Sequence, residues 1–491
     1  MRLSQWIFGL VLAVVIFAQQ SCFEEEFTMS GDAVVGFSLD TLRFDTVFTE
    51  LGSATRSFRI YNDNELAIRI SKVSLEGDPS SFRINVDGNT GPEVTDVEVL
   101  GGDSIWVFVE VTVDPDADIS VSPFVIEDYI VVEVNGNTQK VLLEAWGQNA
   151  NYLPSKEFGN QVALLSCDMG EIEWSDPKPY VIYGTILIDS CTLIWPEGTE
   201  IYVHGGFADN ELGSYNDGII YTLPKGRIVT RGTVENPVSI QDDRIEEEYT
   251  SVWGGIRLGP GSGPHFFKNT SIGNAVTGLV VDSAAAANLE NVVIYNSAGS
   301  GLFARFAEVD AVNSLFYDNG GAGVALTFGG TYNLDYCTIA SYGNDSEGLV
   351  INNFYCSDPF CSEGARVTNI DARLRNLIVA GSARDEISLT NAAPDEPQIR
   401  FDVSMEDCIV TVDDLLDEDR WPNFFPEICA NCIEYKFGDT LFVDRNMADY
   451  HLDTMSIAEK LATPLPGVVS DLDGFARDPF SPDIGCYEFL D

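Results

Sequence analysis

The sequence is poor in histidine and in positive charge. Only three histidines occur in 491 residues, and 27 lysines and arginines stand against 77 aspartates and glutamates. The net charge of −50 repels the phosphates of nucleic acids, so nucleic-acid binding is excluded as a function. Such a surface favours solubility and offers sites for loosely held Ca²⁺, but no dedicated cofactor is predicted.

Long apolar runs are also scarce. The one candidate, WIFGLVLAVVIFA at residues 6–18, follows Met1-Arg2. A spanning helix needs about 20 apolar residues, so this run is short for a permanent anchor. A short basic start and an apolar stretch of this length are typical of a secretory signal peptide.

The boundary QQSC resembles the cleavage box of bacterial lipoproteins, especially its relaxed form in Bacteroidetes, although Gln19 stands where stricter boxes carry Leu. The resemblance implies a signal peptide over residues 1–21, lipid attachment at Cys22 and an acidic tether over residues 22–32. The glutamates at 24–26 resemble a surface-export tag. These features imply a cell-surface protein anchored in the outer-membrane lipid; the alternative is ordinary secretion with Cys22 lost or free.

Residues 33–147 alternate apolar and polar side chains in short runs such as SFRIYND and SIWVFVEVTVDP. About seven such strands predict an antiparallel β-sandwich of immunoglobulin type, although the Cys–Trp–Cys signature of antibody domains is absent. The stretch resembles the Ig-like modules of large bacterial and ciliary proteins, which act as spacers or docking units. Residues 148–157 are predicted to be a linker.

Residues 158–491 contain a repeat. Short apolar runs broken by Gly, Asn and Ser cannot form helices, and equivalent runs must stack on one another to bury their side chains. Three short parallel strands per coil satisfy this pattern. Two polar columns, predicted to be structural side-chain ladders, recur at a spacing of 22 residues: Asn269, Asn291, Asn313 and Asp335, and Asn274, Asn296 and Asp318.

This repeat resembles the right-handed parallel β-helix of the pectin-lyase-like superfamily. The C-terminal DLDGFARDPFSPDIGCYEF resembles the terminal signature of bacterial β-helix proteins, with Cys486 where Ala is common. The predicted fold class is therefore all-β, with an N-terminal Ig-like β-sandwich followed by a right-handed parallel β-helix solenoid. Loop insertions are expected near residues 352–367 and 411–435.

The cysteines are predicted to form small loops. Without Cys22, nine remain, so at least one must stay unpaired in any disulfide framework. Cys356 can bridge to Cys361, and Cys429 to Cys432. A structural zinc site needs two such pairs or added histidines, and no histidine lies near Cys429 in the sequence, so no metal site is predicted.

The resemblance implies polysaccharide lyases and glycoside hydrolases as one class of function. A Ca²⁺-dependent lyase needs several carboxylates at coil spacing, but the two polar columns hold only Asp318 and Asp335. For the paired carboxylates of a hydrolase, Asp242-Asp243 has no histidine in its coil, and His204 has no partner acid nearby in the sequence. No catalytic residue is predicted.

Arginines gather in one stretch of this acidic sequence: Arg366, Arg373, Arg375 and Arg384, beside an insertion with Tyr355 and Phe360. Arginine binds carboxylates and sulfates, and aromatic rings stack on sugars. The predicted function is a flank that binds a polysaccharide, surface glycan or other partner. Three alternatives stay open: arginines that only neutralise nearby aspartates, a lyase or hydrolase with an unrecognised site, and a purely structural envelope protein.

Overall fold

The computed structural model describes residues 26–48, 55–77, 81–112, 124–148, 150–153, 162–210, 213–243, 253–357, 361–362, 364–418, 420–436 and 438–490. The predicted signal peptide, Cys22 and Phe360 lie outside these residues. The chain divides into two compact units, with the boundary between Asn149 and Ala150. No helix in the described part is long and apolar enough to cross a membrane.

The N-terminal unit contains two sheets of five described strands each. The first has the order β1 (Gly36–Phe37), β3 (Arg56–Tyr61), β8 (Ser104–Val111), β5 (Phe82–Val86) and β6 (Asn89–Gly91). The second has the order β2 (Thr41–Phe48), β10 (Asn137–Gln148), β9 (Phe124–Val134), β4 (Ile68–Leu75) and β7 (Glu93–Val99). Neighbouring strands pair antiparallel except β2 and β10, which run parallel.

The alternating sequence of these strands explains how the two sheets pack. In β8, Ile105, Val107 and Val109 are buried, whereas Trp106 and Phe108 point outward. The buried side chains of both sheets form one hydrophobic cluster, so the sheets pack face to face. The predicted all-β class is confirmed; the immunoglobulin type of this sandwich stays a prediction.

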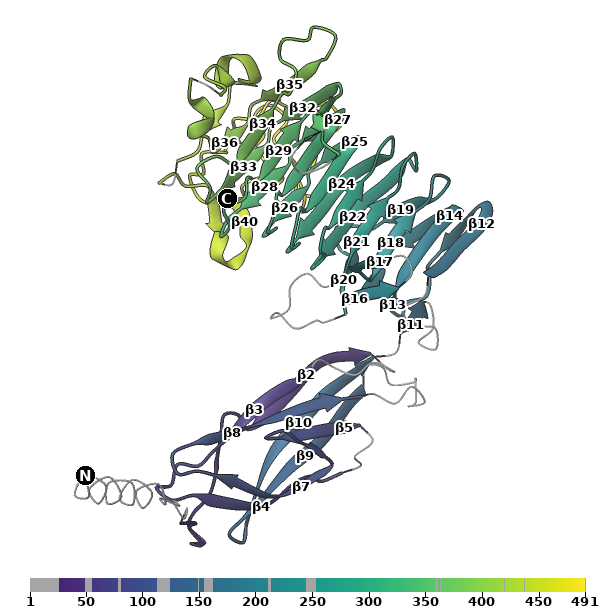
Figure 1. Cartoon of the computed structure of the whole chain (residues 1–491). Helices are drawn as coiled ribbons and strands as arrows, with labels where there is room; N and C mark the ends of the chain where they lie inside the picture. The colour runs from purple at the N-terminus through teal and green to yellow at the C-terminus, as the bar shows by residue number, and fades with distance from the viewer. Residues whose placement is uncertain are drawn as a thin grey trace, which may run out of the picture. The chain divides into compact units, whose positions relative to one another are not determined.

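The C-terminal unit is built on one continuous series of parallel strands, seen as successive rungs in Figure 1. It begins with β11 (Asn151–Leu153), β12 (Val162–Glu173), β13 (Tyr180–Tyr183), β14 (Thr185–Pro196), β15 (Glu200–His204), β18 (Ile219–Thr222), β19 (Arg227–Arg231), β20 (Val238–Asp242), β21 (Gly255–Leu258), β22 (His265–Gly273), β23 (Leu279–Val281) and β24 (Ala286–Tyr295). Asn151–Leu153 were predicted to belong to the linker, but they pair with β13 inside the solenoid.

The series continues with β25 (Leu302–Val312), β26 (Leu315–Tyr317), β27 (Val324–Asp335), β28 (Thr338–Ser341), β29 (Leu349–Asn352), β32 (Ile370–Arg375), β33 (Ile378–Gly381), β34 (Ile387–Thr390), β35 (Phe401–Glu406), β36 (Ile409–Val410), β37 (Cys429–Ala430) and β38 (Ile433–Glu434). Outside it lie the hairpins β16–β17 (Phe207–Asn210, Gly213–Asn216), β30–β31 (Phe354–Tyr355, Arg366–Val367) and β39–β40 (Phe442–Asp444, Asp449–Leu452), and the short helical segments η3 (Asp414–Leu416), η4 (Phe424–Ile428) and η5 (Arg445–Met447).

Strand pairing between coils divides this parallel β-helix into three faces. Face A contains β15, β20, the ends of β22 and β24, β26, β28, β33, β36 and β38. Face B contains β18, β21, β23, the starts of β25 and β27, β29 and β34. Face C contains β19, the starts of β22 and β24, the ends of β25 and β27, β32, β35 and β37.

The first polar column forms hydrogen bonds from coil to coil. Asn291 donates from Nδ2 to Asn269 Oδ1 at 3.0 Å, and Asn313 donates to Asn291 Oδ1 at 3.3 Å. All three residues have positive φ, between 44° and 55°. Asparagine tolerates this left-handed conformation better than most residues, which explains its recurrence at the turn.

The second column behaves in the same way over most of its length. Asn296 donates to Asn274 Oδ1 at 2.7 Å, and Asn274 donates to Asp242 Oδ1 at 2.9 Å. Asp318 shares the left-handed backbone, but its carboxylate accepts from the hydroxyl of Tyr450 at 3.2 Å.

Asp335 does not continue the first ladder, and that prediction is wrong. It pairs with Val312 rather than Asn313, and its carboxylate accepts two hydrogen bonds from Arg375, at 2.8 and 2.7 Å. The left-handed position in this coil belongs to Tyr336, with φ of 51°.

The register changes because β27 contains one residue more than β25. Arg305 pairs with Thr327, but Ala307 pairs with Gly330, so Phe306 alone faces two residues. Gly329 and Gly330 both have positive φ, which glycine adopts without a steric penalty. This bulge lengthens the coil by one residue. The residues that follow it in β27 are therefore displaced by one position from the columns that the sequence predicts.

The segment after β38 folds back over the outside of face A. Two hydrophobic clusters join outward residues of face A to this segment: Leu315, Ala340, Ile378, Ala380 and Ile409 on the coil, and Leu441, Tyr450, Leu452, Leu472, Ile484 and Cys486 on the segment. Face A is therefore apolar on both sides along these coils, as a doubly covered parallel sheet should be.

The terminal signature holds this segment in place. Arg477 is buried, donates to Glu488 Oε1 at 3.0 Å and to Asn313 Oδ1 at 2.9 Å, and lies 3.9 Å above the ring of Tyr336. Asn376 donates to the carbonyl of Thr463 at 2.8 Å. The signature residues thus join the last segment to the Asn ladder.

Candidate functional site

The structure does not bring the four predicted arginines together. Arg375 is paired with Asp335, and Arg384 with Asp413 and Asp414, each at 2.7 Å. The hydrogen bonds that Arg384 donates to Asp413 raise the pKa of Arg384. Arg373 is exposed on the outside of face C, and Arg366 lies on the β30–β31 hairpin. Two of the four therefore neutralise aspartates, as the alternative interpretation predicts.

The predicted insertion near residues 352–367 is the β30–β31 hairpin. Tyr355 pairs directly with Arg366, and the structure joins Cys356 to Cys361 at the hairpin's end. The Tyr355 ring is exposed and meets the ring of Phe328 edge-on, with centroids 5.1 Å apart. The hairpin therefore places a tyrosine beside the bulge of β27.

Next to Tyr355 lies an arginine that the sequence did not single out. Arg305 donates from Nε and Nη2 to the two carboxylate oxygens of Asp282, at 2.8 and 2.6 Å. Tyr355 and Tyr221 are both electrostatic neighbours of its guanidinium. The hydrogen bonds to Asp282 raise the pKa of Arg305, so its charge is firmly held.

A second arginine beside it has no carboxylate partner among the described residues. Arg257 lies half-buried on the outer side of β21, and its Nε has no hydrogen-bond partner in the described structure. Burial lowers the pKa of Arg257, and the positive charge of Arg305 acts in the same direction. We call Tyr221, Arg257, Asp282, Arg305, Phe328 and Tyr355 the face B cluster.

The face B cluster was not predicted from the sequence because its members come from different coils. Asp282 and Arg305 are 23 residues apart, and the ion pair of Lys268 with Glu290 spans 22. Opposite charges that are one coil apart in an alignment of the repeats therefore predict an ion pair between neighbouring coils. Arg257 carries no such signal, because its distinguishing feature is the absence of a carboxylate partner among the described residues.

His204 also has a partner that the sequence did not reveal. Its Nδ1 lies 2.7 Å from Asp243 Oδ2, so the expectation that no acid lies near His204 is wrong. The two residues are distant in sequence, but β15 and β20 are neighbours in face A, with Val203 opposite Asp242. A carboxylate bound to one imidazole nitrogen orients the other, which is an arrangement suited to proton transfer.

The β-helix unit also contains two further disulfides and a cleft among its described residues. Disulfides join Cys429 to Cys432 and, unpredicted, Cys167 to Cys191. A cleft of about 520 Å³ beside Tyr342, Tyr435 and Arg445 also includes the predicted ladder residue Asp318. In the described part of the chain, no group of three or more His, Cys, Asp or Glu residues is arranged to hold a metal ion.

A sequence comparison supports the fold of the C-terminal unit. Residues 254–392 match the family described as "Right handed beta helix region", so this part of the chain is a right-handed β-helix. The match covers the coils that carry Arg257, Arg305 and Tyr355. No curated protein sequence matches the chain.

One of the solved structures similar to part of the chain is a family 123 glycoside hydrolase from Clostridium perfringens, studied for glycolipid glycan hydrolysis. It shares 8% sequence identity, over 38% of this chain and 48% of that chain, with a TM-score of 0.20. The chain thus spans about half the length of that structure. A likeness this distant carries no argument about function.

Proposed function

We propose that the protein is a lipid-anchored, surface-exposed lipoprotein whose β-helix binds an acidic glycan at the face B cluster. The observation that carries this proposal is Arg257, a half-buried guanidinium without a carboxylate partner in the described structure of a chain with 77 acidic residues. A buried charge is costly unless it is paired, so a negatively charged ligand would remove that cost.

The chemistry around Arg257 suits a sugar that carries a carboxylate or sulfate. A guanidinium can donate two parallel hydrogen bonds to either anion. Tyr355 and Phe328 offer aromatic surface on which the apolar side of a sugar ring can pack, and Tyr221 supplies a hydroxyl near the same arginines. The cluster therefore combines a specific charge contact with a stacking surface.

The anchor is proposed from the sequence. QQSC at residues 19–22 supports acylation of Cys22, and the following glutamates support export to the outer surface. On this reading the N-terminal sandwich, of proposed Ig-like type, carries the β-helix away from the membrane. Polysaccharide capture or adhesion is the role that fits this order of parts.

A polysaccharide lyase or glycoside hydrolase is the second candidate. The observation that favours it is the contact between His204 and Asp243, which could hold a general acid or base at the surface of face A. This candidate requires chemical change in the polymer, whereas the binding proposal requires none.

One experiment tests the binding proposal. The full chain is passed over immobilised polygalacturonate and over uncharged dextran, and retention is compared for Arg257→Ala and for Arg400→Ala. Arg400 is an exposed arginine next to Asp402 and provides the matched loss of one charge. Because a charged hydrogen-bonded contact is worth about 1.5–3 kcal/mol, Arg257→Ala should weaken binding roughly 10- to 100-fold.

Equal retention of the two variants would contradict the binding proposal. Polygalacturonate in solution is also incubated with the parent protein and examined for shorter polymer chains. Their release by the parent protein, and its loss in His204→Gln, would support the second candidate instead.

A further inference from the structure

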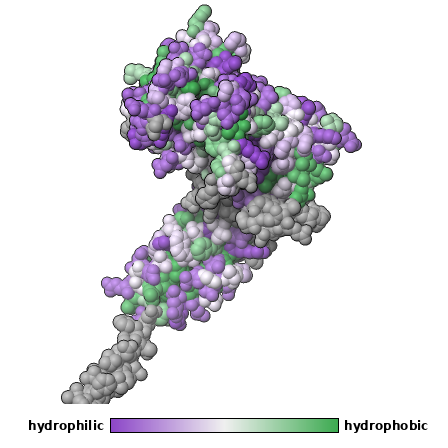
Figure 2. Space-filling view, turned by 45° about the horizontal axis from the view of Figure 1, so that its top comes forward, coloured by the Kyte–Doolittle hydropathy of each residue, from purple (hydrophilic) through white to green (hydrophobic). Residues whose placement is uncertain are grey.

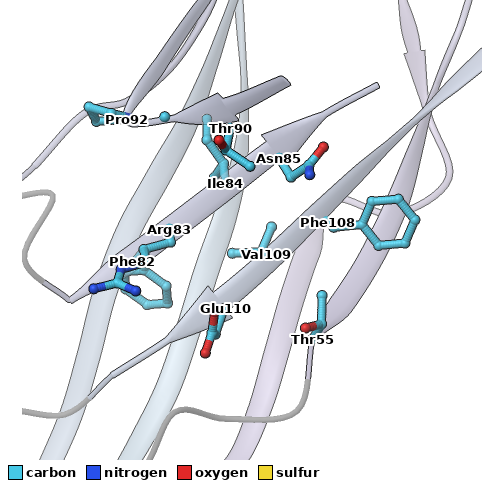
Figure 3. A pocket seen from close by; sticks show the side chains of 11 residues that line it. Thr55, Phe82, Arg83, Ile84, Asn85, Thr90, Pro92, Phe108, Val109 and Glu110 are labelled. Atoms are coloured by element: carbon cyan, nitrogen blue, oxygen red, sulfur yellow. The ribbon is translucent and has the colours of Figure 1, made fainter. Parts of the chain in front are cut away.

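The outer face of the first N-terminal sheet exposes two neighbouring aromatic residues. Trp106 and Phe108 alternate with the buried residues of β8 and are 42% and 40% exposed. Their ring centroids are 6.1 Å apart and their planes differ by 23°. In Figure 3 the ring of Phe108 is seen face-on, beside the strand that carries Val109 and Glu110. Two large aromatic residues side by side on an exposed sheet are typical of a binding surface.

The cations on this face differ from the other cations of the same unit. On and around the second sheet, Arg69 pairs with Glu98, Lys72 with Glu133, and Lys140 with Glu76. Neither Arg59 nor Arg83, on the first sheet, forms an ion pair with any described carboxylate. The guanidinium of Arg59 lies 4.1 Å from the ring centre of Trp106, a cation–π contact that holds it over the aromatic surface.

A cavity of about 700 Å³ lies beside Phe108, over β5, β6 and β8. Figure 3 shows Arg83, Asn85, Thr90 and Glu110 around it. Asn85 accepts from the backbone of Gly88 through Oδ1 at 2.9 Å, which leaves its Nδ2 available to donate. The cavity thus combines an aromatic ring with hydrogen-bond donors and acceptors and with Arg83, which lies opposite Glu110 but forms no ion pair with a carboxylate among the described residues. Sites for polar ligands have this combination.

We propose that this face is a second acidic-polysaccharide site, distinct from the face B cluster and located on the N-terminal unit. A sugar ring stacks on Phe108, and its carboxylate or sulfate groups pair with Arg59 and Arg83. The C–H groups of a sugar ring carry partial positive charge and pack well on the negative face of an aromatic ring. The arginine forks supply the selectivity for anionic substituents.

The charge of the molecule favours a glycan over a second copy of the chain. Each copy carries a net charge of −50, so two copies repel one another at long range. The few sugars that contact this face bring far less charge than a second copy of the chain, and at physiological ionic strength the chain's distant carboxylates are screened beyond about 8 Å. The local contact with Arg59 and Arg83 then dominates.

The proposal is tested in the full chain carrying Arg257→Ala, so that the face B cluster does not contribute. The probes are polygalacturonate, which carries carboxylates, dextran sulfate, which carries sulfates, and uncharged dextran. Phe108→Ala should weaken binding of the charged probes roughly tenfold. The matched control is Tyr129→Ala, because Tyr129 is 39% exposed on the second sheet and also has a cation, Lys140, near its ring.

A second variant, Arg59→Gln with Arg83→Gln, leaves the aromatic surface intact and should lower binding of both charged probes toward the level of uncharged dextran. Three results would overturn the proposal. They are no binding of either charged probe by the Arg257→Ala chain, equal binding by the Phe108→Ala and Tyr129→Ala variants, and equal binding of the charged probes and uncharged dextran by the Arg257→Ala chain.

Discussion

The Asn ladder predicts a graded loss of stability when Asn291 is replaced. Its side chain is 9% exposed and lies in the middle of the first column. Nδ2 donates to Asn269 Oδ1 at 3.0 Å, and Oδ1 accepts from Asn313 Nδ2 at 3.3 Å. The backbone φ is 55°, in the left-handed region. Substitution therefore acts on two hydrogen bonds and on one strained backbone conformation.

The two contributions can be estimated separately. Loss of two hydrogen bonds costs about 2 kcal/mol, at about 1 kcal/mol each. An alanine in the left-handed region adds about 1–2 kcal/mol, so Asn291→Ala should lower the free energy of unfolding by about 3–4 kcal/mol. Glycine avoids that strain but gains unfolded-state entropy, so Asn291→Gly should be roughly 0.5–1 kcal/mol less destabilising than Asn291→Ala.

Urea denaturation of the full chain measures these differences. The control is Asn288→Ala on the same strand, because Asn288 has an ordinary backbone and makes one long hydrogen bond of 3.4 Å to the carbonyl of His265. Its cost should stay below about 1 kcal/mol. The reasoning is refuted if Asn291→Ala costs no more than Asn288→Ala, or if Asn291→Gly is the more damaging of the two Asn291 variants.

Two further predictions concern the last segment and the anchor. His451 contacts Asp473 at 2.8 Å and Asp449 at 2.6 Å, and these hydrogen bonds raise its pKa from 6.5 to about 9. The stability that protonated His451 contributes is fully present below pH 6.5 and is lost as the pH rises through about 9. His451→Gln should therefore reduce the fall in melting temperature between about pH 6 and about pH 10. An unchanged fall would exclude His451 as the source of this pH dependence. Cys22→Ser should move the protein from the membrane fraction to the soluble fraction of the producing cell; continued membrane attachment would refute lipidation at Cys22.

Some features of the candidate sites lay within reach of the sequence. Tyr355 was identified because an aromatic residue stood in an insertion between recognisable coils. The cysteine pairs that close small loops, Cys356 with Cys361 and Cys429 with Cys432, are separated by five and three residues, so proximity in sequence was sufficient. Cys167 and Cys191, 24 residues apart, meet because consecutive coils stack.

The sequence alone determined the type of coil and the ladder from Asn269 to Asn313. Both depend on short apolar runs and on one spacing of 22 residues, which are local properties of the chain. The ladder prediction failed at Asp335, where a single extra residue in β27 changed the register. Successive side chains of a strand point to opposite faces, so a register shift of one residue changes which side chain occupies a given position. The bulge in β27, opposite Phe306, is therefore sufficient to end a column.

Only the tertiary structure decided which side chains meet across coils. His204 and Asp243, Arg305 and Asp282, and Arg477 and Asn313 are brought together by the lengths of all the coils and turns between them. Arg257, Arg59 and Arg83 have no ion-pair partner among the described residues, and this too depends on which residues the tertiary structure places around each of them. The local spacing of apolar residues specifies a strand and its period. Which residues meet on neighbouring coils depends instead on the lengths of all the turns between them, and each insertion changes that total length.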